Sequence, residues 1–512
     1  MRRIETFLIA LICLAGPAAA QQPLSAIDWL EKQASIPVAQ PRIIVPDEPP
    51  VTDSATTPGV KVTPLGESRP DSVGLLPSAS TGLPRGLWQA SRTEALSRLF
   101  AHADPESLPA VRALLYTLLL AEADAPLETA AGGGAFLKAR LHALTRFGAV
   151  DPARALLERA GPETPALFDT WLNLSLLSGN EDQACATLRK TPTLSNDYAA
   201  RVFCTARAGD WDTAALTYEA ASALGALTPP EGTLLAQFLD PDLIETAQPA
   251  VPPKAPTPLV FRLYEAVGTP LPTRALPRAF AVADLRGLSG WKAEIEAAER
   301  LARTGALPTG RLLGLYTERK PAASGGVWDR VTAMQTLDKA LFRRAPEDVA
   351  NALPDAWNAA RTQGIEVPFA QMFWTPLSNI VLPDRVQDLA FRIALLSPDY
   401  EAAAQEFEAG GRADRLLSGL ARGAPERDLA QTRLERAVVA GFTAQGAAPA
   451  HRALIDAGKL GEAILSAALL MGHGTPGSEA DVTAALSTLR AVGLEDTARR
   501  AALQLLILGT GQ

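Results

Sequence analysis

Three stretches of this chain share one pattern of small and acidic residues at nearly regular intervals. They are GAVDPARALL from Gly148, GNEDQACATL from Gly179 and GDWDTAALTY from Gly209, at spacings of 31 and 30 residues. Each has Gly, then Asp three residues later, then Ala two residues after that. A fixed period of about 30 residues is typical of arrays of helical hairpins, so the pattern restricts this chain to helical folds more strongly than any other feature.

Each residue type has its own expected role at a turn between two helices. Glycine ends the first helix because it adopts the left-handed conformation without steric cost. Aspartate caps the second helix by accepting from free backbone N–H groups, and alanine lets the two helices approach closely. The pattern returns later in GKLGEAILSA, which also has Gly461, and in GLEDTARRAA. The residues assigned to these junctions are Gly148, Asp151, Ala153, Gly179, Asp182, Ala184, Gly209, Asp212, Ala214, Gly458, Ala463, Gly493, Asp496 and Ala498.

The composition agrees with an all-α fold. Aromatic residues make up only 6% of the chain, and the remaining apolar residues are mostly Ala and Leu, which form helices at little cost. The segment GDWDTAALTYEAA, from Gly209 to Ala221, resembles the Gly–x–aromatic–Asp–x–Ala junction of tetratricopeptide-repeat proteins. The resemblance is specific from Gly148 to Ala221 and loose from Gly458 to Ala501. It implies an irregular, tetratricopeptide-like α-solenoid that binds a protein or peptide on its concave face.

The first 20 residues have the pattern of a bacterial secretory signal. Arg2 and Arg3 precede an apolar run, FLIALICLA, and small residues end at Ala20, where we predict cleavage and export to the periplasm. The alternatives are a retained anchor and a lipoprotein attached at Cys13, which is disfavoured because Ile12 is bulky. The mature chain has no second apolar stretch near the ~18 residues that a membrane helix needs.

The rest of the chain divides by its prolines. We predict a short amphipathic helix within 21–36, a proline-rich disordered linker over 37–86, a helical-repeat block over 87–247, a second proline-rich linker over 248–258, and a helical-repeat block over 259–512. Ten prolines between residues 37 and 85 remove backbone donors. The alternative is that this tether lies along the folded body, with Ile43–Val45 and Gly74–Leu76 held against it.

The helix at the end of the tether, SAIDWLEKQ, carries Ile27, Trp29 and Leu30 as its apolar surface. About ten residues cannot hold a helix alone in water, because nucleation is costly. We therefore expect a docking helix that is received either by the body of the same chain or by a partner protein.

The cysteines are more informative than any other reactive residue. After signal removal only Cys185 and Cys204 remain, and the repeat register places them level on two neighbouring helices. An oxidising compartment favours a disulfide between them; the alternative is two buried free thiols, which pack as small hydrophobes.

We find no catalytic or metal-binding motif. His102, His142, His451 and His473 have no partner at metal-ligand spacing, and GHGTPG (472–477) follows a helix instead of a strand, so it is read as a loop. We therefore expect no cofactor and no enzymatic activity.

The formal net charge of −8 gives no basic surface for nucleic acid. The leading hypothesis is an exported scaffold or adaptor that binds another periplasmic or membrane-anchored protein, for example as an accessory of a motility or envelope-assembly machine. The alternatives are a peptidoglycan-acting hydrolase on a helical solenoid and a structural or stress-protective protein. A cleft lined by two acids, one with a raised pKa, would favour the hydrolase.

Overall fold

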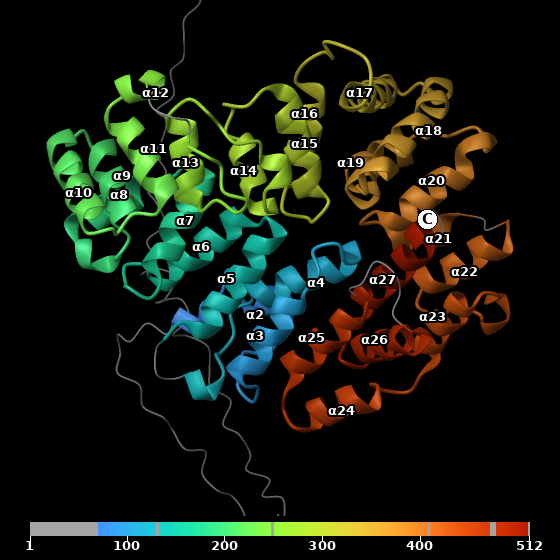
Figure 1. Cartoon of the computed structure of the whole chain (residues 1–512). Coiled ribbons are helices and arrows are strands. Elements are labelled where there is room, and N and C mark those ends of the chain that lie inside the picture. The colour runs from blue at the N-terminus through green and yellow to red at the C-terminus, as the bar shows by residue number, and fades with distance from the viewer. Residues whose placement is uncertain (1–69, 130–132, 247–249, 408–409, 472–477, 510–512) are drawn as a thin grey trace, which may run out of the picture. The chain divides into compact units, whose positions relative to one another are not determined.

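The computed structural model describes residues 70–129, 133–246, 250–407, 410–471 and 478–509 (Figure 1). Over these ranges the backbone forms 26 α-helices, several short 3-10 helices and no strand, which confirms the all-α class. None of the helices in these ranges is long and apolar enough to span a bilayer. The predicted signal peptide, the docking residues Ile27, Trp29 and Leu30, and the linker up to residue 69 lie outside the described residues.

The helices follow one another with short connections. In the first half they are η2 (Pro70–Ser72), α2 (Ser78–Thr81), α3 (Thr93–His102), α4 (Pro109–Leu120), η3 (Leu127–Thr129), α5 (Ala135–Phe147), α6 (Val150–Ala160), α7 (Phe168–Ser178), α8 (Asp182–Lys190), η4 (Pro192–Leu194), α9 (Tyr198–Arg207), α10 (Trp211–Ala223), α11 (Pro229–Leu239) and α12 (Asp242–Thr246).

The second half continues in the same way. Its helices are α13 (Pro258–Ala266), η5 (Thr273–Ala275), η6 (Arg278–Phe280), α14 (Ala281–Asp284), α15 (Trp291–Ala302), α16 (Thr309–Thr317), α17 (Val327–Arg343), α18 (Pro346–Gln363), α19 (Glu366–Ser378), α20 (Asp384–Leu396), α21 (Tyr400–Glu406), α22 (Arg412–Ala421), η7 (Arg427–Leu429), α23 (Arg433–Thr443), α24 (Pro449–Asp456), α25 (Leu460–Leu470), α26 (Glu479–Ala491) and α27 (Glu495–Leu508).

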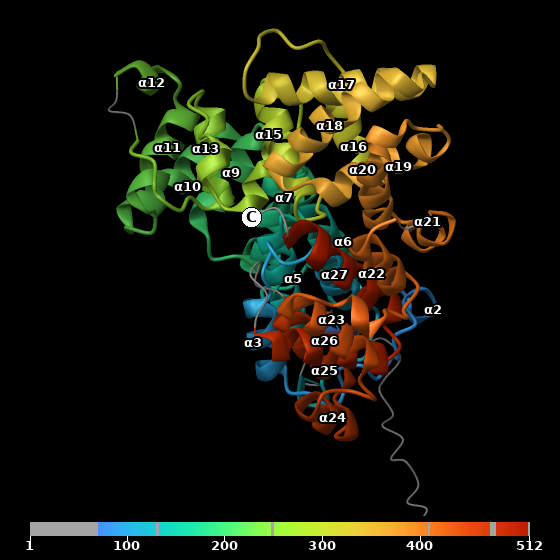
Figure 2. The same ribbon diagram turned by 90° about the vertical axis from the view of Figure 1, so that its right-hand side faces the viewer.

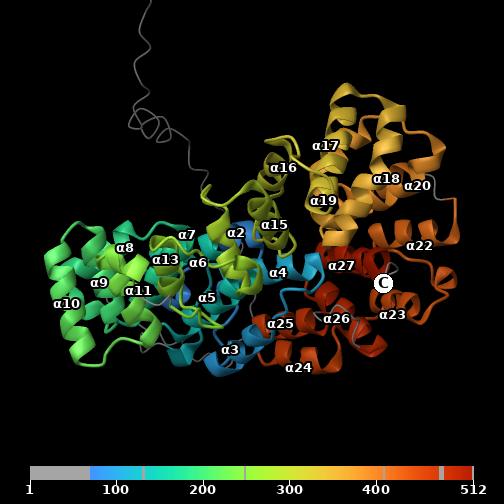
Figure 3. The ribbon, with the colours of Figure 1, turned by 45° about the horizontal axis from the view of Figure 1, so that its top comes forward.

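The junctions predicted from the sequence are turns between packed helices. Gly148 and Gly179 follow α5 and α7 with φ of 83° and 74°, the left-handed conformation that ends a helix. The helices on either side contact each other, as α5 does α6 and α7 does α8, and Figure 3 shows α8 to α11 side by side. The alanines of the pattern are fully buried at these contacts: Ala153, Ala184, Ala214, Ala463 and Ala498.

The capping role predicted for the junction aspartates is wrong. Asp151 and Asp496 are the second residues of α6 and α27, and the preceding caps of those helices make no side-chain hydrogen bond. Asp182 likewise begins α8, and in α10 the cap is Asp210, which accepts from the Thr213 backbone N–H at 3.2 Å, while Asp212 lies inside the helix. An acid in the first turn still stabilises a helix through its dipole, which explains the pattern without a cap.

At the junction after Gly458, the position of the aspartate is taken by Gly461, because another part of the chain packs there. The Trp88 ring lies so close that a Cβ on Gly461 would come within 2.5 Å of it. The Gly461 backbone N–H also donates to the Leu87 carbonyl at 3.2 Å. This junction therefore joins the N-terminal and C-terminal parts of the described body.

Further contacts hold those two parts together. α4 packs against α25 and α27 (Figure 1), and α3 packs against α25 (Figure 2). The buried Gln504 side chain accepts from the Ala110 backbone N–H at 2.7 Å, across 394 residues of sequence. One hydrophobic cluster consequently contains residues from Leu83 to Leu506, and it includes Leu234 and Leu259 from both sides of the segment 248–258. A second cluster runs from Ala281 to Leu396.

Among the described residues, packed structure is already present from Pro70 onward, so residues 70–86 are not part of a disordered linker as predicted. Residues Gly74–Leu76 lie against the end of α4, where the backbone N–H groups of Leu75 and Leu76 donate to Leu120 at 2.8 and 3.0 Å. The buried Arg140 guanidinium holds the same segment by donating to the carbonyls of Val73, Leu119 and Ala121. For Gly74–Leu76, the alternative of a tether lying along the body is the one observed.

The contact between Trp88 and Gly461 gives a direct test of how the N-terminal and C-terminal parts of the described body are joined. Gly461→Ala should lower the free energy of unfolding by about 1–3 kcal/mol, because the buried Trp88 and the Leu87 carbonyl cannot both move aside. Gly310→Ala is the matched control, since Gly310 is also the second residue of its helix and has open space around it. The control should be neutral or stabilising by up to ~1 kcal/mol. Equal effects in urea titrations would contradict the close packing.

Candidate protein-binding surface

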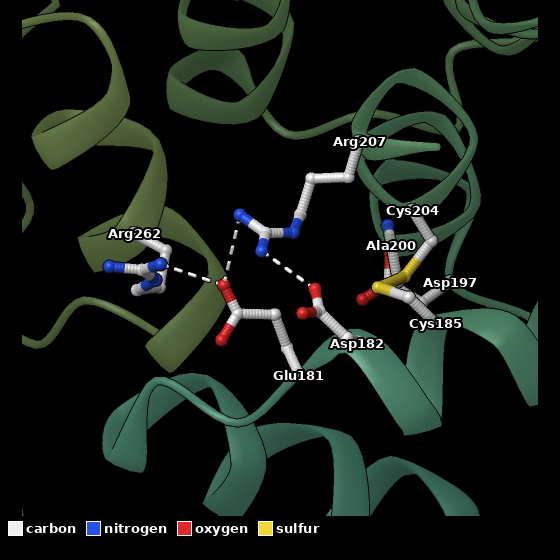
Figure 4. The surroundings of a disulfide bond; sticks show 8 residues. All are labelled: Glu181, Asp182, Cys185, Asp197, Ala200, Cys204, Arg207 and Arg262. Carbon is white, nitrogen blue, oxygen red and sulfur yellow. Dashed lines mark hydrogen bonds and ion pairs between the residues drawn. A yellow bond between two sulfur atoms is a disulfide. The ribbon is translucent and has the colours of Figure 1, made fainter. Parts of the chain in front are cut away.

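Cys185 in α8 and Cys204 in α9 form a disulfide bond (Figure 4). Their Cα atoms are 4.8 Å apart, and both side chains are buried. The pairing predicted from the sequence is confirmed in place of two free thiols. With no CxxC spacing and with both sulfurs buried, the bond has the properties of a structural crosslink.

A buried ion-pair network lies beside the disulfide and joins α8 and α9 to α13. The Glu181 carboxylate has a fully buried side chain, and it lies 2.7 Å from Arg262 and 3.3 Å from Arg207. Burial lowers the pKa of Arg262, but the hydrogen bonds and charges of Glu181 and Glu265 outweigh burial and raise it. Asp182 accepts from Arg207 at 2.7 Å (Figure 4). Removing one partner would leave a buried charge uncompensated, so this network holds helices in place.

Two of the described histidines have structural contacts, and the third, His142, is exposed on α5. His451 is buried, its Nδ1 lies 2.8 Å from the Thr488 hydroxyl, and burial lowers its pKa. The His102 ring lies 2.7 Å from the Arg98 carbonyl. Within the described ranges no group of three or more His, Cys, Asp or Glu side chains is placed to hold a metal ion. His473 and the GHGTPG loop fall outside them.

An apolar groove of about 250 Å³ opens between the end of α19, the start of α20 and α21. Its apolar lining comes mainly from Trp374, Ile380, Val381, Leu382, Phe391 and Phe407. Val381, in this lining, is 91% exposed. The groove therefore leaves a contiguous apolar lining open to solvent instead of burying it in the core.

Local sequence explains why this surface stays open. Pro376 lies in the last turn of α19, and Pro383 is the cap that precedes α20, so the helix ends after Ser378 and residues 379–382 form a non-helical connection at the surface. Gln387 holds this connection by donating to the Leu382 carbonyl at 3.2 Å. The Phe391 and Phe407 rings stack in parallel at 4.0 Å between centroids, which gives the groove a rigid aromatic side.

α10 presents a second apolar surface. Only Ala214 and Ala221 of this helix are buried, whereas Trp211 and Leu216 are 49% and 72% exposed, and Leu224, which caps the end of the helix, is 72% exposed. α10 packs against α9 and α11, and the Trp211 ring lies 5.9 Å from that of Phe238. The groove is the better-defined site, because three packed elements enclose its volume.

Sequence reasoning did not find the groove. The signal was present as NIVLP (379–383), an apolar run between two helices. Such a run is also typical of a buried connection, and only the packing of α19, α20 and α21 shows that Val381 faces solvent.

Comparisons with known proteins add no assignment. No protein-family model matches the chain, and no curated protein and no solved structure matches it either.

The disulfide predicts a stability difference. Replacing both cysteines by serine should lower the free energy of unfolding by about 3 kcal/mol, because the bond closes a loop of roughly twenty residues in the unfolded chain. Urea titration of the mature protein, oxidised and with dithiothreitol, measures this, and the reduced wild type should approach the double variant. Finding two reactive thiols in the unreduced, denatured protein would contradict the bond.

Proposed function

We propose that the protein is an exported, non-enzymatic scaffold or adaptor that binds another protein of the bacterial cell envelope. The open apolar groove at Val381 is the observation that carries this proposal, because exposed apolar hollows with a polar rim are typical of protein-binding sites. Ser378, Gln387 and Glu406 supply the polar rim. The apolar face of a partner helix or an extended apolar segment would fit such a groove.

The compartment is inferred from two independent features. The first 20 residues have the signal pattern, and the disulfide between Cys185 and Cys204 is of a kind that persists in oxidising compartments. We therefore propose the periplasm, with a partner that is periplasmic or membrane-anchored.

The proposed architecture is an irregular tetratricopeptide-like α-solenoid. Its support is the recurring junction, in which a left-handed glycine and a buried alanine join two packed helices at Gly148, Gly179 and Gly209. Arrays of this kind present extended surfaces to proteins and peptides.

The N-terminal docking helix would then extend the same function. With Ile27, Trp29 and Leu30 as its apolar surface, it would dock to a partner at a reach set by the proline-rich tether. The competing possibility is that it docks on the body of its own chain.

The position of Val381 in the groove predicts that a charge there weakens partner binding. Val381→Asp should reduce crosslinked partner recovered from periplasm by about tenfold, because a charge cannot be buried in an apolar interface without a counter-ion. Val251→Asp is the matched control, since Val251 is 83% exposed at a distant connection. Thermal unfolding of both variants should match that of the wild type.

Deletion of residues 21–36 separates the contribution of the N-terminal helix in the same experiment. Loss of the crosslinked partner from Val381→Asp alone assigns binding to the groove. Loss from both Val381→Asp and the deletion variant assigns binding to the groove and the N-terminal helix together. Equal recovery from all four proteins would refute the groove as the binding site.

One observation favours the hydrolase alternative. Glu106 and Glu366 line one cavity, and burial raises the pKa of Glu366, as a catalytic acid requires. Glu106 is ion-paired with Arg278, and arginines around Glu366 act in the opposite direction on its pKa. Release of soluble fragments from peptidoglycan by the wild type, lost in Glu366→Gln, would establish this alternative over the adaptor.

A further inference from the structure

A cavity of about 720 Å³ lies where three distant parts of the chain meet. Most of its walls come from the loop before α4 and the start of that helix, from the end of α18 and the start of α19, and from the end of α27, and the side chains of Arg303 after α15 and Leu434 in α23 complete the lining. It is separate from the apolar groove at Val381, with which it shares no lining residue. Three arginines line it: Arg112, Arg303 and Arg361.

Arg112 is a buried cation that makes no direct ion pair with the described residues, although the charges of Glu106 and Glu366 act on it from nearby. Its side chain donates to the carbonyls of Ser107 and Pro105, and it forms no ion pair with any described residue. Burial lowers the pKa of its guanidinium to about 10, so it remains charged at neutral pH. A buried charge of this kind is costly unless an anion compensates it.

The other two arginines also have unused donors. The Nε of Arg303 donates to the Gln363 carbonyl at 2.7 Å, which fixes the guanidinium beside the end of α18. Arg361, in the last turn of α18, is exposed and has no hydrogen bond or ion pair with the described residues. Planar guanidinium groups bind carboxylates and phosphates through two parallel N–H bonds.

The acidic groups of the cavity do not balance these charges. Glu106 is paired with Arg278 from outside the lining, so Glu366 is the remaining carboxylate that opposes the three arginines. Arg300 lies near enough to Arg303 for their charges to interact unfavourably. The Ser107 hydroxyl is buried in the lining and has no hydrogen-bond partner among the described residues. In a chain with a net charge of −8, this cavity is therefore locally cationic.

We propose that this cavity binds an organic anion through Arg112, Arg303 and Arg361, with carboxylate or phosphate groups as the recognised chemistry. The volume lies within the range of small-molecule sites, roughly 300–1,000 Å³, and a single inorganic anion would leave most of it empty. Leu434, Leu505 and Leu508 line the cavity as well and would contact the carbon skeleton. The ligand would thus bridge α4, α18, α19 and α27.

Calorimetric titration and thermal unfolding of the mature protein test this, with citrate and inorganic phosphate as separate probes at constant ionic strength. We expect saturable binding and a rise in unfolding temperature, since a ligand that binds only the folded state stabilises it. Tighter binding of citrate would assign the site to polycarboxylates, and tighter binding of phosphate to phosphorylated compounds.

Two substitutions should change the affinity in opposite directions. Arg361→Gln should weaken binding by about tenfold, because one charge-assisted contact is lost. Glu366→Gln should strengthen it by removing the opposing carboxylate. Neither is expected to prevent folding, which the unfolding temperature without ligand checks.

Arg343→Gln is the matched control for Arg361→Gln, since Arg343 is an exposed arginine in the last turn of the neighbouring α17. It should leave binding unchanged, as should Val381→Asp, which separates this site from the proposed protein-binding groove. Absence of saturable binding with both probes up to about 10 mM, or equal weakening by Arg361→Gln and Arg343→Gln, would overturn the proposal.

Discussion

The close packing of Trp88 on Gly461, together with that of α4 on α27, is the constraint on which the rest of the described structure depends. It joins helices separated by almost the whole length of the folded body, and the Gln504 side chain satisfies the Ala110 backbone N–H at the same contact. Because these contacts are made between distant parts of the chain, they must repay a large loss of chain entropy. Buried apolar surface from both ends supplies that stabilisation.

This packing of the N-terminal part on the C-terminal part, which we call closure, also determines which binding surfaces the protein has. The arginine-lined cavity exists only because α27 and the loop before α4 meet the α18–α19 turn, so a ligand there would hold the closed arrangement. The apolar groove at Val381, in contrast, is built locally by α19, α20 and α21. The two surfaces could therefore act independently, one for an anion and one for an apolar segment of a protein.

The features that the sequence predicted well are local. Gly148 and Gly179 were identified as helix ends, Ala153 and Ala184 as close contacts, and Cys185 with Cys204 as a disulfide, because each follows from spacing along one helical hairpin. The prediction that Asp151 caps α6 is wrong, because the capping residue and an acid in the first turn of a helix are only one or two positions apart in the sequence. Local composition distinguishes these poorly.

The features that the sequence missed depend on distant contacts. Prolines between residues 70 and 86 suggested a linker, but Arg140 holds that segment against the end of α4. The signal for closure was Gly461, which stands where other junctions have aspartate, yet nothing in the sequence identified Trp88 as the reason. Arg112 in α4, Arg361 in α18 and Arg303 at the end of α15 are ordinary arginines in the sequence, and only the packing of distant helices brings them together.

Hydrogen exchange of the native protein tests closure most directly. Backbone amides of 111–120 in α4 and 499–508 in α27 should open with the same free energy, and Gly461→Ala should lower both by the same amount, because a cooperative unit opens as a whole. Exchange of α27 at a much lower free energy than α4, with α4 unaffected by the substitution, would contradict the account.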